Sequence, residues 1–432
     1  MRDAILFLAL IGIIPFIFKR PVVGALAYAC VGLMNPHRMT YGAAYDFPFA
    51  MVLGGITLFS LLVSKEAKKI PWTGTVAALL LFIAWIMLTT LFALEPELAW
   101  LEWQRVMKTM LMVTLTIMTV RTIKDVQALT LVVALSVGFW GFKGGIFTIL
   151  SGGTSRVLGP EGSYIADNNT LALALLTALP LLVFLGTLAP NKWLKRAAIG
   201  VALLTAAAIV GSYSRGAMLG GVGMLFFLWL KSKNKLTTGI AILVLAPVVY
   251  LSMPEQWTGR MESIDNYQED ESAMGRINAW GFAINVANTL PLGGGLRVFT
   301  PKMFLIYAPE PTQYRVAHSV YFQVLGEHGY IGLLIYLFLF FSAWRTGSRI
   351  LRFCKDKIEL GWAARLAQMC QVSMIGFLMA GAFLALAYYD LIYYVIAILI
   401  TLEKVLILAP QADNTAPMKV PFLHRFLERK PV

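Results

Sequence analysis

Apolar residues run along this chain in long unbroken stretches instead of alternating with polar residues at every second position. A helix needs about 20 apolar residues to cross the hydrocarbon core of a membrane, whereas the strands of a membrane barrel alternate. The runs therefore predict a bundle of membrane-spanning helices, because only helices and closed barrels satisfy their backbone polar groups in lipid. The candidate runs are 3–18, 21–34, 47–64, 73–94, 106–120, 126–150, 170–188, 196–213, 216–230, 236–253, 318–344, 364–387 and 390–408. The first two are short enough to form one crossing together, so we expect 12 or 13 crossings.

Composition supports the same class of protein. Of the 432 residues, 58% are hydrophobic and 14% are charged, whereas a soluble domain has about 25% charged residues. This excludes a soluble enzyme, a disordered chain and a nucleic-acid-binding domain. We expect residues 1–432 to form a single all-α polytopic membrane domain.

The net charge of +13 is distributed unevenly between the two sides of this bundle. If the loops alternate sides, one side carries most of the Lys and Arg residues, in the loops near 65–69, 121–124, 192–196, 231–235 and 345–365 and in the tail 409–432. Cytoplasmic loops of membrane proteins carry such an excess. That side, and the C-terminus with it, is therefore predicted to be cytoplasmic.

The opposite side carries one long connection, residues 254–317. Connections of this length are usually functional. Within it, apolar residues recur every three to four positions over 272–290, which predicts an amphipathic helix lying at the membrane interface. The glycine-rich segment P-L-G-G-G-L, 291–296, predicts a turn after this helix.

Four arginines on this side are candidates for binding an anionic group: Arg156, Arg215, Arg276 and Arg297. Arginine at membrane depth is costly and usually marks a functional site, and its guanidinium group binds phosphate oxygens in a bidentate manner. The alternative is that these side chains reach out to lipid headgroups or pair with nearby acids. Arg215 is the strongest candidate, because in G-S-Y-S-R-G-A (211–217) two runs meet almost without a loop.

His318 opens the segment H-S-V-Y-F-Q-V-L-G-E-H-G, where the long connection enters a span. A histidine there can accept a proton near neutral pH; the alternative is a structural histidine at the helix entry. Helical spacing puts Glu327 on a different face, so a direct pair is not implied. His328 is interpreted as a packing residue, and Asp167 or Asn168 as the N-cap of a helix starting near Thr170.

Metal and nucleotide chemistry find little support in the sequence. The four histidines lack the spacing of metal ligands, and the acidic residues between 265 and 271 resemble an ordinary solvated run. Glycine patterns that hold nucleotide phosphates are missing. We therefore expect no metal site, no cofactor and no nucleotide-activated donor.

Four motifs in this order resemble the bacterial O-antigen ligases. They are S-R-G-A at a junction of spans, G-R-x-x-x-W and G-x-G in the long connection, and H-S-x-Y-F-x-x-L-G-E-H-G at its end. The resemblance extends from about residue 70 to residue 400. The N-terminal stretch 20–50 is similar to the O-glycosylation ligases that are associated with exosortase systems.

The resemblance implies a glycosyltransferase of the GT-C type in the bacterial inner membrane, with its active site facing the periplasm and with no metal. The donor would be a glycan on undecaprenyl diphosphate, and the acceptor a sugar hydroxyl of lipid A–core in lipopolysaccharide biosynthesis. His318 would be the general base, Arg215 and Arg276 would hold the diphosphate, and inversion at the anomeric carbon is expected. Further candidates for substrate binding are Arg156, Arg297, Glu161 and Tyr321.

Two other functions stay open at this point. The same donor chemistry serves a protein acceptor, as in an O-glycosylation ligase, or a glycan acceptor, as in an O-antigen polymerase. A transporter or flippase of an anionic lipid-linked glycan is a different class. Transporters commonly contain inverted repeats, and this sequence contains no recognisable repeat.

Overall fold

A computed structural model describes residues 1–65, 68–231, 234–237, 239–240, 243, 255 and 271–408 of the chain. Most of the run 236–253, nearly all of 254–270 with its acidic residues, and the tail 409–432 lie outside the described residues. The cytoplasmic side predicted for that tail therefore stays a prediction.

Every regular element in these ranges is a helix. The elements are α1 (Arg2–Lys19), α2 (Pro21–Met34), η1 (Pro36–Met39), α3 (Phe49–Val63), α4 (Gly74–Leu91), α5 (Pro96–Thr119), α6 (Ile123–Leu150), α7 (Asn168–Leu188), α8 (Lys192–Gly211), α9 (Arg215–Lys231), α12 (Glu271–Thr289), α13 (Pro301–Tyr307), α14 (Val320–Phe353), η2 (Ile358–Leu360), α15 (Gly361–Gly381), α16 (Asp390–Glu403) and η3 (Lys404–Leu408).

Seven helical segments in the described part are long and apolar enough to span a membrane. They are Gly74–Leu91, Ile123–Leu150, Asn168–Leu188, Lys192–Gly211, Val320–Phe353, Ile358–Gly381 and Asp390–Leu408. Three shorter apolar helices are Pro21–Met34, Phe49–Val63 and Arg215–Leu230. The expected all-helical membrane protein is confirmed, whereas 12 or 13 crossings stay a prediction.

Local sequence chemistry determines where several of these helices begin. The Thr122 hydroxyl accepts from the amide of Asp125, and the Asp125 carboxylate accepts from the amide of Thr122, which forms a reciprocal cap at the start of α6. Asp167, one of the two N-cap candidates in the sequence, caps α7 by accepting from the amides of Asn169 (2.8 Å) and Thr170 (3.2 Å). These caps satisfy amide groups that a helix cannot pair internally.

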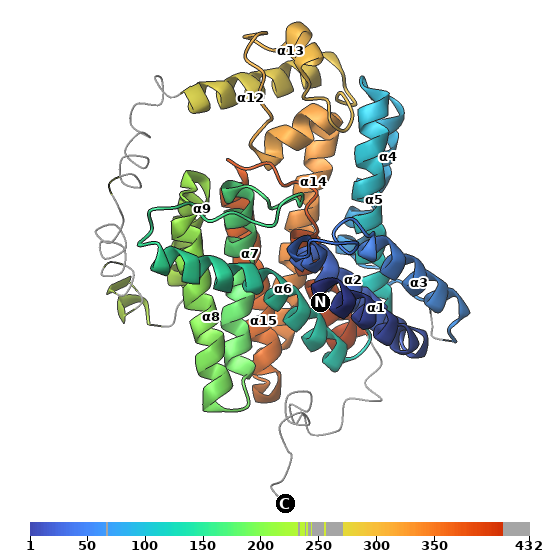
Figure 1. Cartoon of the computed structure of the whole chain (residues 1–432), viewed down its shortest axis with the longest axis vertical. Coiled ribbons are helices and arrows are strands. Elements are labelled where there is room, and N and C mark those ends of the chain that lie inside the picture. Colours follow the sequence, from blue (N-terminus) through green and yellow to red (C-terminus); the bar gives the residue numbers. More distant parts are fainter. Residues whose placement is uncertain are drawn as a thin grey trace, which may run out of the picture.

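The long helices pack side by side, and α12 and α13 lie across one end of them (Figure 1). Helix α15 contacts α7, α9, α14 and α16, and α14 also contacts α4 and α12. We call residues 271–317, which include α12 and α13, the cap. The α7–α8 turn, with Lys192, Lys195 and Arg196, lies at the opposite end from the cap (Figure 1).

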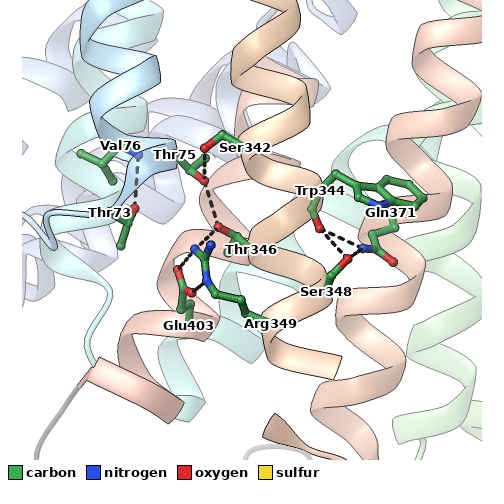
Figure 2. A network of polar contacts seen from close by, with 10 residues as sticks. All are labelled: Thr73, Thr75, Val76, Ser342, Trp344, Thr346, Ser348, Arg349, Gln371 and Glu403. Carbon is green, nitrogen blue, oxygen red and sulfur yellow. Dashed lines mark hydrogen bonds and ion pairs between the residues drawn. The ribbon is translucent and has the colours of Figure 1, made fainter. Parts of the chain in front are cut away.

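Polar contacts at a distance from the cap join four of the helices (Figure 2). Arg349 on α14 donates to both carboxylate oxygens of Glu403 on α16, at 2.6 and 3.1 Å, and also to the Thr346 hydroxyl. Thr346 lies 2.9 Å from the Thr75 hydroxyl on α4. On the other face of α14, Gln371 of α15 donates to the backbone oxygen of Trp344. Each group therefore finds a partner inside the bundle, where water is scarce.

Candidate active site

His318 lies where the cap returns to the bundle, two residues before the start of α14. Its backbone is left-handed, with φ of 43°, a conformation that is uncommon for residues other than glycine. Trp280 of α12 contacts residues on both sides of His318. Its indole N–H donates to the Ala317 oxygen at 2.9 Å, and its ring stacks on the Phe322 ring with 4.8 Å between ring centres. Packing of α12 on the start of α14 therefore imposes the unusual backbone at His318.

The electrostatic surroundings of His318 favour a neutral imidazole. Partial burial lowers its pKa below the ordinary value, and the nearby positive charges of Arg276 and Arg315 lower it further, whereas the Asp167 carboxylate raises it. A neutral ring has a free lone pair at neutral pH and can accept a proton. Arg276, on α12, and Asp167, at the start of α7, are therefore near enough to His318 for their charges to act on it.

Arg215 begins α9, directly after the tight turn 212–214 that follows α8. Tyr213 in this turn has φ of 60°, and its hydroxyl donates to the Gly153 oxygen. The Arg156 guanidinium carbon lies 5.9 Å from the centre of the Tyr213 ring. Asn168 at the start of α7 donates to the Ser212 oxygen at 2.7 Å. The loop 151–167 and the start of α7 thus hold the turn that carries Arg215.

The Arg215 turn also meets the residues around α12. Gly216 packs so closely on Phe383 that an added Cβ would lie 3.0 Å from the Phe383 Cβ. The Phe383 ring in turn lies 6.5 Å from the ring of Trp280, one helical turn from Arg276 on α12. Arg215, Arg276 and His318 therefore come from three elements that converge at the cap end of the bundle.

Arg297 lies in a different group of residues, around Glu102. The Arg297 guanidinium is 3.6 Å from the Glu102 carboxylate, which also accepts from the Tyr164 hydroxyl at 2.8 Å and lies 3.5 Å from Arg105. Glu102 is only 7% exposed. Sequence reasoning missed Glu102; its spacing of three residues from Arg105 on α5 was the available signal.

The glycine-rich turn of the cap docks on a break inside α14. At Gly329 the backbone leaves the helical region, with φ of 68°. The amides of Gly294 and Gly295 donate to the oxygens of Gly326 (2.8 Å) and Glu327 (2.9 Å). A Cβ at Gly293 would lie 2.5 Å from the Gly329 nitrogen, so glycine is required there. The G-x-G and G-E-H-G motifs are therefore two halves of one contact.

Beneath this contact lies a buried chain of polar side chains. The Tyr388 hydroxyl donates to Glu327 at 2.5 Å and lies 2.8 Å from Nε2 of His328, whose Nδ1 lies 2.6 Å from the Thr89 hydroxyl. Tyr388 has one proton and gives it to Glu327, so its hydroxyl oxygen accepts from His328 Nε2. His328 thus packs in the bundle as the sequence indicated, and Glu327 finds partners other than His318.

Two further candidates lie apart from the groups described above. Tyr321 is on the first turn of α14, but its hydroxyl donates to the Leu378 oxygen on α15 at 2.7 Å and so has a structural partner. Glu161 is exposed in the loop 151–167. Within the described ranges, no three His, Cys, Asp or Glu side chains lie together as a metal site would require.

Comparison with known protein families divides the chain into two parts. Residues 1–189 match a family of unknown function, so the expected likeness to exosortase-associated ligases is not confirmed. Residues 200–337 match the O-antigen ligase family. No curated protein matches the chain. The second match contains Arg215, Arg276, Arg297 and His318, whereas Arg156 and Glu161 lie in the first. Residues 200–337 of this chain are thus similar to the O-antigen ligase family.

Proposed function

We propose that this protein transfers a glycan from undecaprenyl diphosphate to a sugar hydroxyl of lipid A–core at the periplasmic face of the inner membrane. The observation that carries the proposal is that the charges of Arg276 and Asp167 both act on His318, with Arg276 and His318 inside the region 200–337 that matches the O-antigen ligase family. A base that stays neutral beside a cationic group suits attack on a donor with an anionic leaving group.

In the proposed reaction, the acceptor hydroxyl oxygen attacks the anomeric carbon of the donor glycan. The new carbon–oxygen bond forms as the bond to the diphosphate oxygen breaks, and the hydroxyl proton passes to His318. Arg215 and Arg276 bind the diphosphate and stabilise the charge that it takes up on leaving. A single displacement of this kind inverts the anomeric centre. The released proton then passes from His318 to water.

The distribution of charge supports a periplasmic position for the cap. The α7–α8 turn with its Lys192, Lys195 and Arg196 lies at the far end of the bundle (Figure 1). Basic loops stay on the cytoplasmic side, so the opposite end, with the cap, is assigned to the periplasm. We also propose the GT-C type and about 12 crossings, since shorter apolar helices accompany the seven long ones.

Reconstitution tests the proposal directly. Purified full-length protein is mixed with undecaprenyl-diphosphate-linked glycan and lipid A–core in detergent, and the product is followed as a shift on a gel. We expect transfer by the wild type and by His37→Ala, which removes a histidine outside this site, but none by His318→Ala. Transfer by His318→Ala at the wild-type rate would overturn the assignment. If the donor is consumed only when a secreted protein is supplied, the acceptor is a protein. If it is consumed only when more donor is supplied, the acceptor is another glycan. Either result changes the proposed acceptor but leaves the proposed site unchanged.

A further inference from the structure

Residues 1–189, which match a family of unknown function, contact the cap through Glu102. Arg105 and Tyr164 belong to the same region and contact Glu102 as well. Together with Arg297 of the O-antigen ligase domain, these residues form what we call the Glu102 cluster. The buried Glu102 carboxylate is at its centre, and the other three side chains approach it from α5, from the loop 151–167 and from the cap.

The ion pairs in the Glu102 cluster are looser than a structural pair elsewhere in the same molecule. Arg349 and Glu403 are joined by two hydrogen bonds of 2.6 and 3.1 Å. In contrast, Arg105 and Arg297 lie 3.5 and 3.6 Å from Glu102. Two guanidinium groups thus share one carboxylate, and each retains N–H donors that Glu102 does not use.

The free sides of the Glu102 cluster are accessible. The side chains of Arg105 and Arg297 are 55% and 54% exposed, and Tyr164 is 41% exposed. Next to Tyr164, at 6.4 Å between ring centres, lies the buried ring of Tyr389. The Tyr389 hydroxyl has no hydrogen-bond partner among the described residues. Exposed N–H donors beside a partly exposed aromatic side chain are what a sugar with many hydroxyl groups binds.

The surrounding structure holds Arg297 in place and connects this cluster to the proposed transfer site along the chain. The backbone of Arg297 is held by Glu327, which accepts its amide proton at 3.0 Å. Tyr164 lies three residues before Asp167, whose charge acts on His318. The loop 151–167 therefore joins the Glu102 cluster to the residues around His318 in one short stretch of chain.

We propose that the Glu102 cluster is a sugar-binding subsite, so that the region 1–189 takes part in substrate recognition. The inference rests on the proposed function, and its ligand is a hydroxyl-rich sugar from one of the two substrates. Arg105 and Arg297 donate to the sugar hydroxyls, and Tyr164 presents its ring to the sugar. A sugar of the acceptor and a sugar of the donor glycan share this chemistry, and kinetics distinguish them.

Arg105→Gln tests the proposal, because the Arg105 side chain does not by itself join the cap to the bundle. Lys108→Gln is the matched control, since it removes a basic, exposed side chain one turn further along α5. In the reconstituted reaction we expect Arg105→Gln to raise KM about tenfold for one substrate, with kcat within threefold of wild type. A higher KM for lipid A–core assigns the subsite to the acceptor, and a higher KM for the lipid-linked glycan assigns it to the donor. Unchanged KM values for both substrates would overturn it.

A binding measurement separates this proposal from the proposed function. Saturation-transfer NMR is recorded with full-length protein and, in turn, delipidated core oligosaccharide and the free glycan released from the donor. We expect contact with one of them in the wild type, in His318→Ala and in Lys108→Gln, and loss of that contact in Arg105→Gln. Signals equal in wild type and Arg105→Gln would reject the subsite even if transfer proceeds. Binding that persists while no transfer occurs would instead reject the reaction.

Discussion

The backbone amide of Arg297 donates to the Glu327 carboxylate at 3.0 Å, although the two residues are 30 positions apart. This bond connects the end of the cap to the interior of α14. The second oxygen of the same carboxylate accepts from Tyr388. Glu327 therefore joins the end of the cap to the interior of the bundle.

The first prediction concerns the pH dependence of transfer. Burial lowers the pKa of His318 most, and neighbouring charges shift it further, so Arg315→Gln should raise that pKa, and Asp167→Asn, which still caps α7, should lower it. The base must be neutral, so activity falls as the pH falls through its pKa. The acid limb of kcat/KM should therefore move to higher pH in Arg315→Gln and to lower pH in Asp167→Asn. Movement of both in one direction would contradict the assignment; Asp46→Asn, an exposed substitution elsewhere, is the control.

The second prediction concerns the geometry of anion binding. Lysine keeps the positive charge of arginine but lacks the planar pair of N–H donors that binds two phosphate oxygens. Arg215→Lys and Arg276→Lys should each lower kcat/KM at least about tenfold, as measured with the lipid-linked donor. Arg345→Lys, on α14 outside the site, should have no effect. Full activity of both site variants would show that only the charge matters.

The third prediction concerns the stability of the cap attachment. Gly293 has φ of 73°, and an added Cβ would lie 2.5 Å from the Gly329 nitrogen. Gly293→Ala should therefore cost at least about 2 kcal/mol of folding free energy, from backbone strain and the clash together. The melting temperature in detergent measures this. Gly55→Ala, where nothing lies within 4 Å of the new Cβ, should leave that temperature unchanged or raise it, and equal melting of the two variants would refute the argument.

The fourth prediction concerns the ion pair of Figure 2. Glu403 is 4% exposed and Arg349 is 40% exposed. Arg349→Met leaves a buried carboxylate without its partner and should destabilise the protein by about 1–3 kcal/mol, less than a fully buried pair because Arg349 is partly solvated. The double variant Arg349→Met/Glu403→Met should recover most of that loss. Thermal melting of the single and double variants provides the comparison, and a double variant no better than Arg349→Met alone would count against it.

Much of the bundle could be predicted because its signal is local. The runs 73–94, 126–150 and 170–188 correspond closely to α4, α6 and α7, since a continuous apolar stretch has few stable forms in lipid. The N-terminal hydrogen bonding of α7 also depends on immediate neighbours, and the sequence predicted it for Asp167 or Asn168. In contrast, the partners of Glu102 come from the loop 151–167 and from the cap. Such long-range pairing leaves no periodic pattern in the sequence.

The candidate site, like the bundle, was predicted only where the signal is local. Arg215, Arg276 and His318 were singled out by residue type and by resemblance, and the structure brings their elements together. The break at Gly329 was not predicted, because it depends on amides of the cap that donate to the backbone oxygens of Gly326 and Glu327 in α14. Glycine in an apolar run does not by itself indicate a break.

The docking of the glycine turn on α14 affects how a genetic screen of this protein should be interpreted. In such a screen, substitutions at Gly293 and Gly329 are expected to abolish activity as completely as substitutions at His318, although neither glycine has a side chain that could react. Protein abundance in the membrane would separate the two classes, because assembly-defective variants are degraded whereas a variant lacking only its base accumulates normally. Positions of this chain that tolerate no change will therefore include residues needed for assembly as well as residues that react.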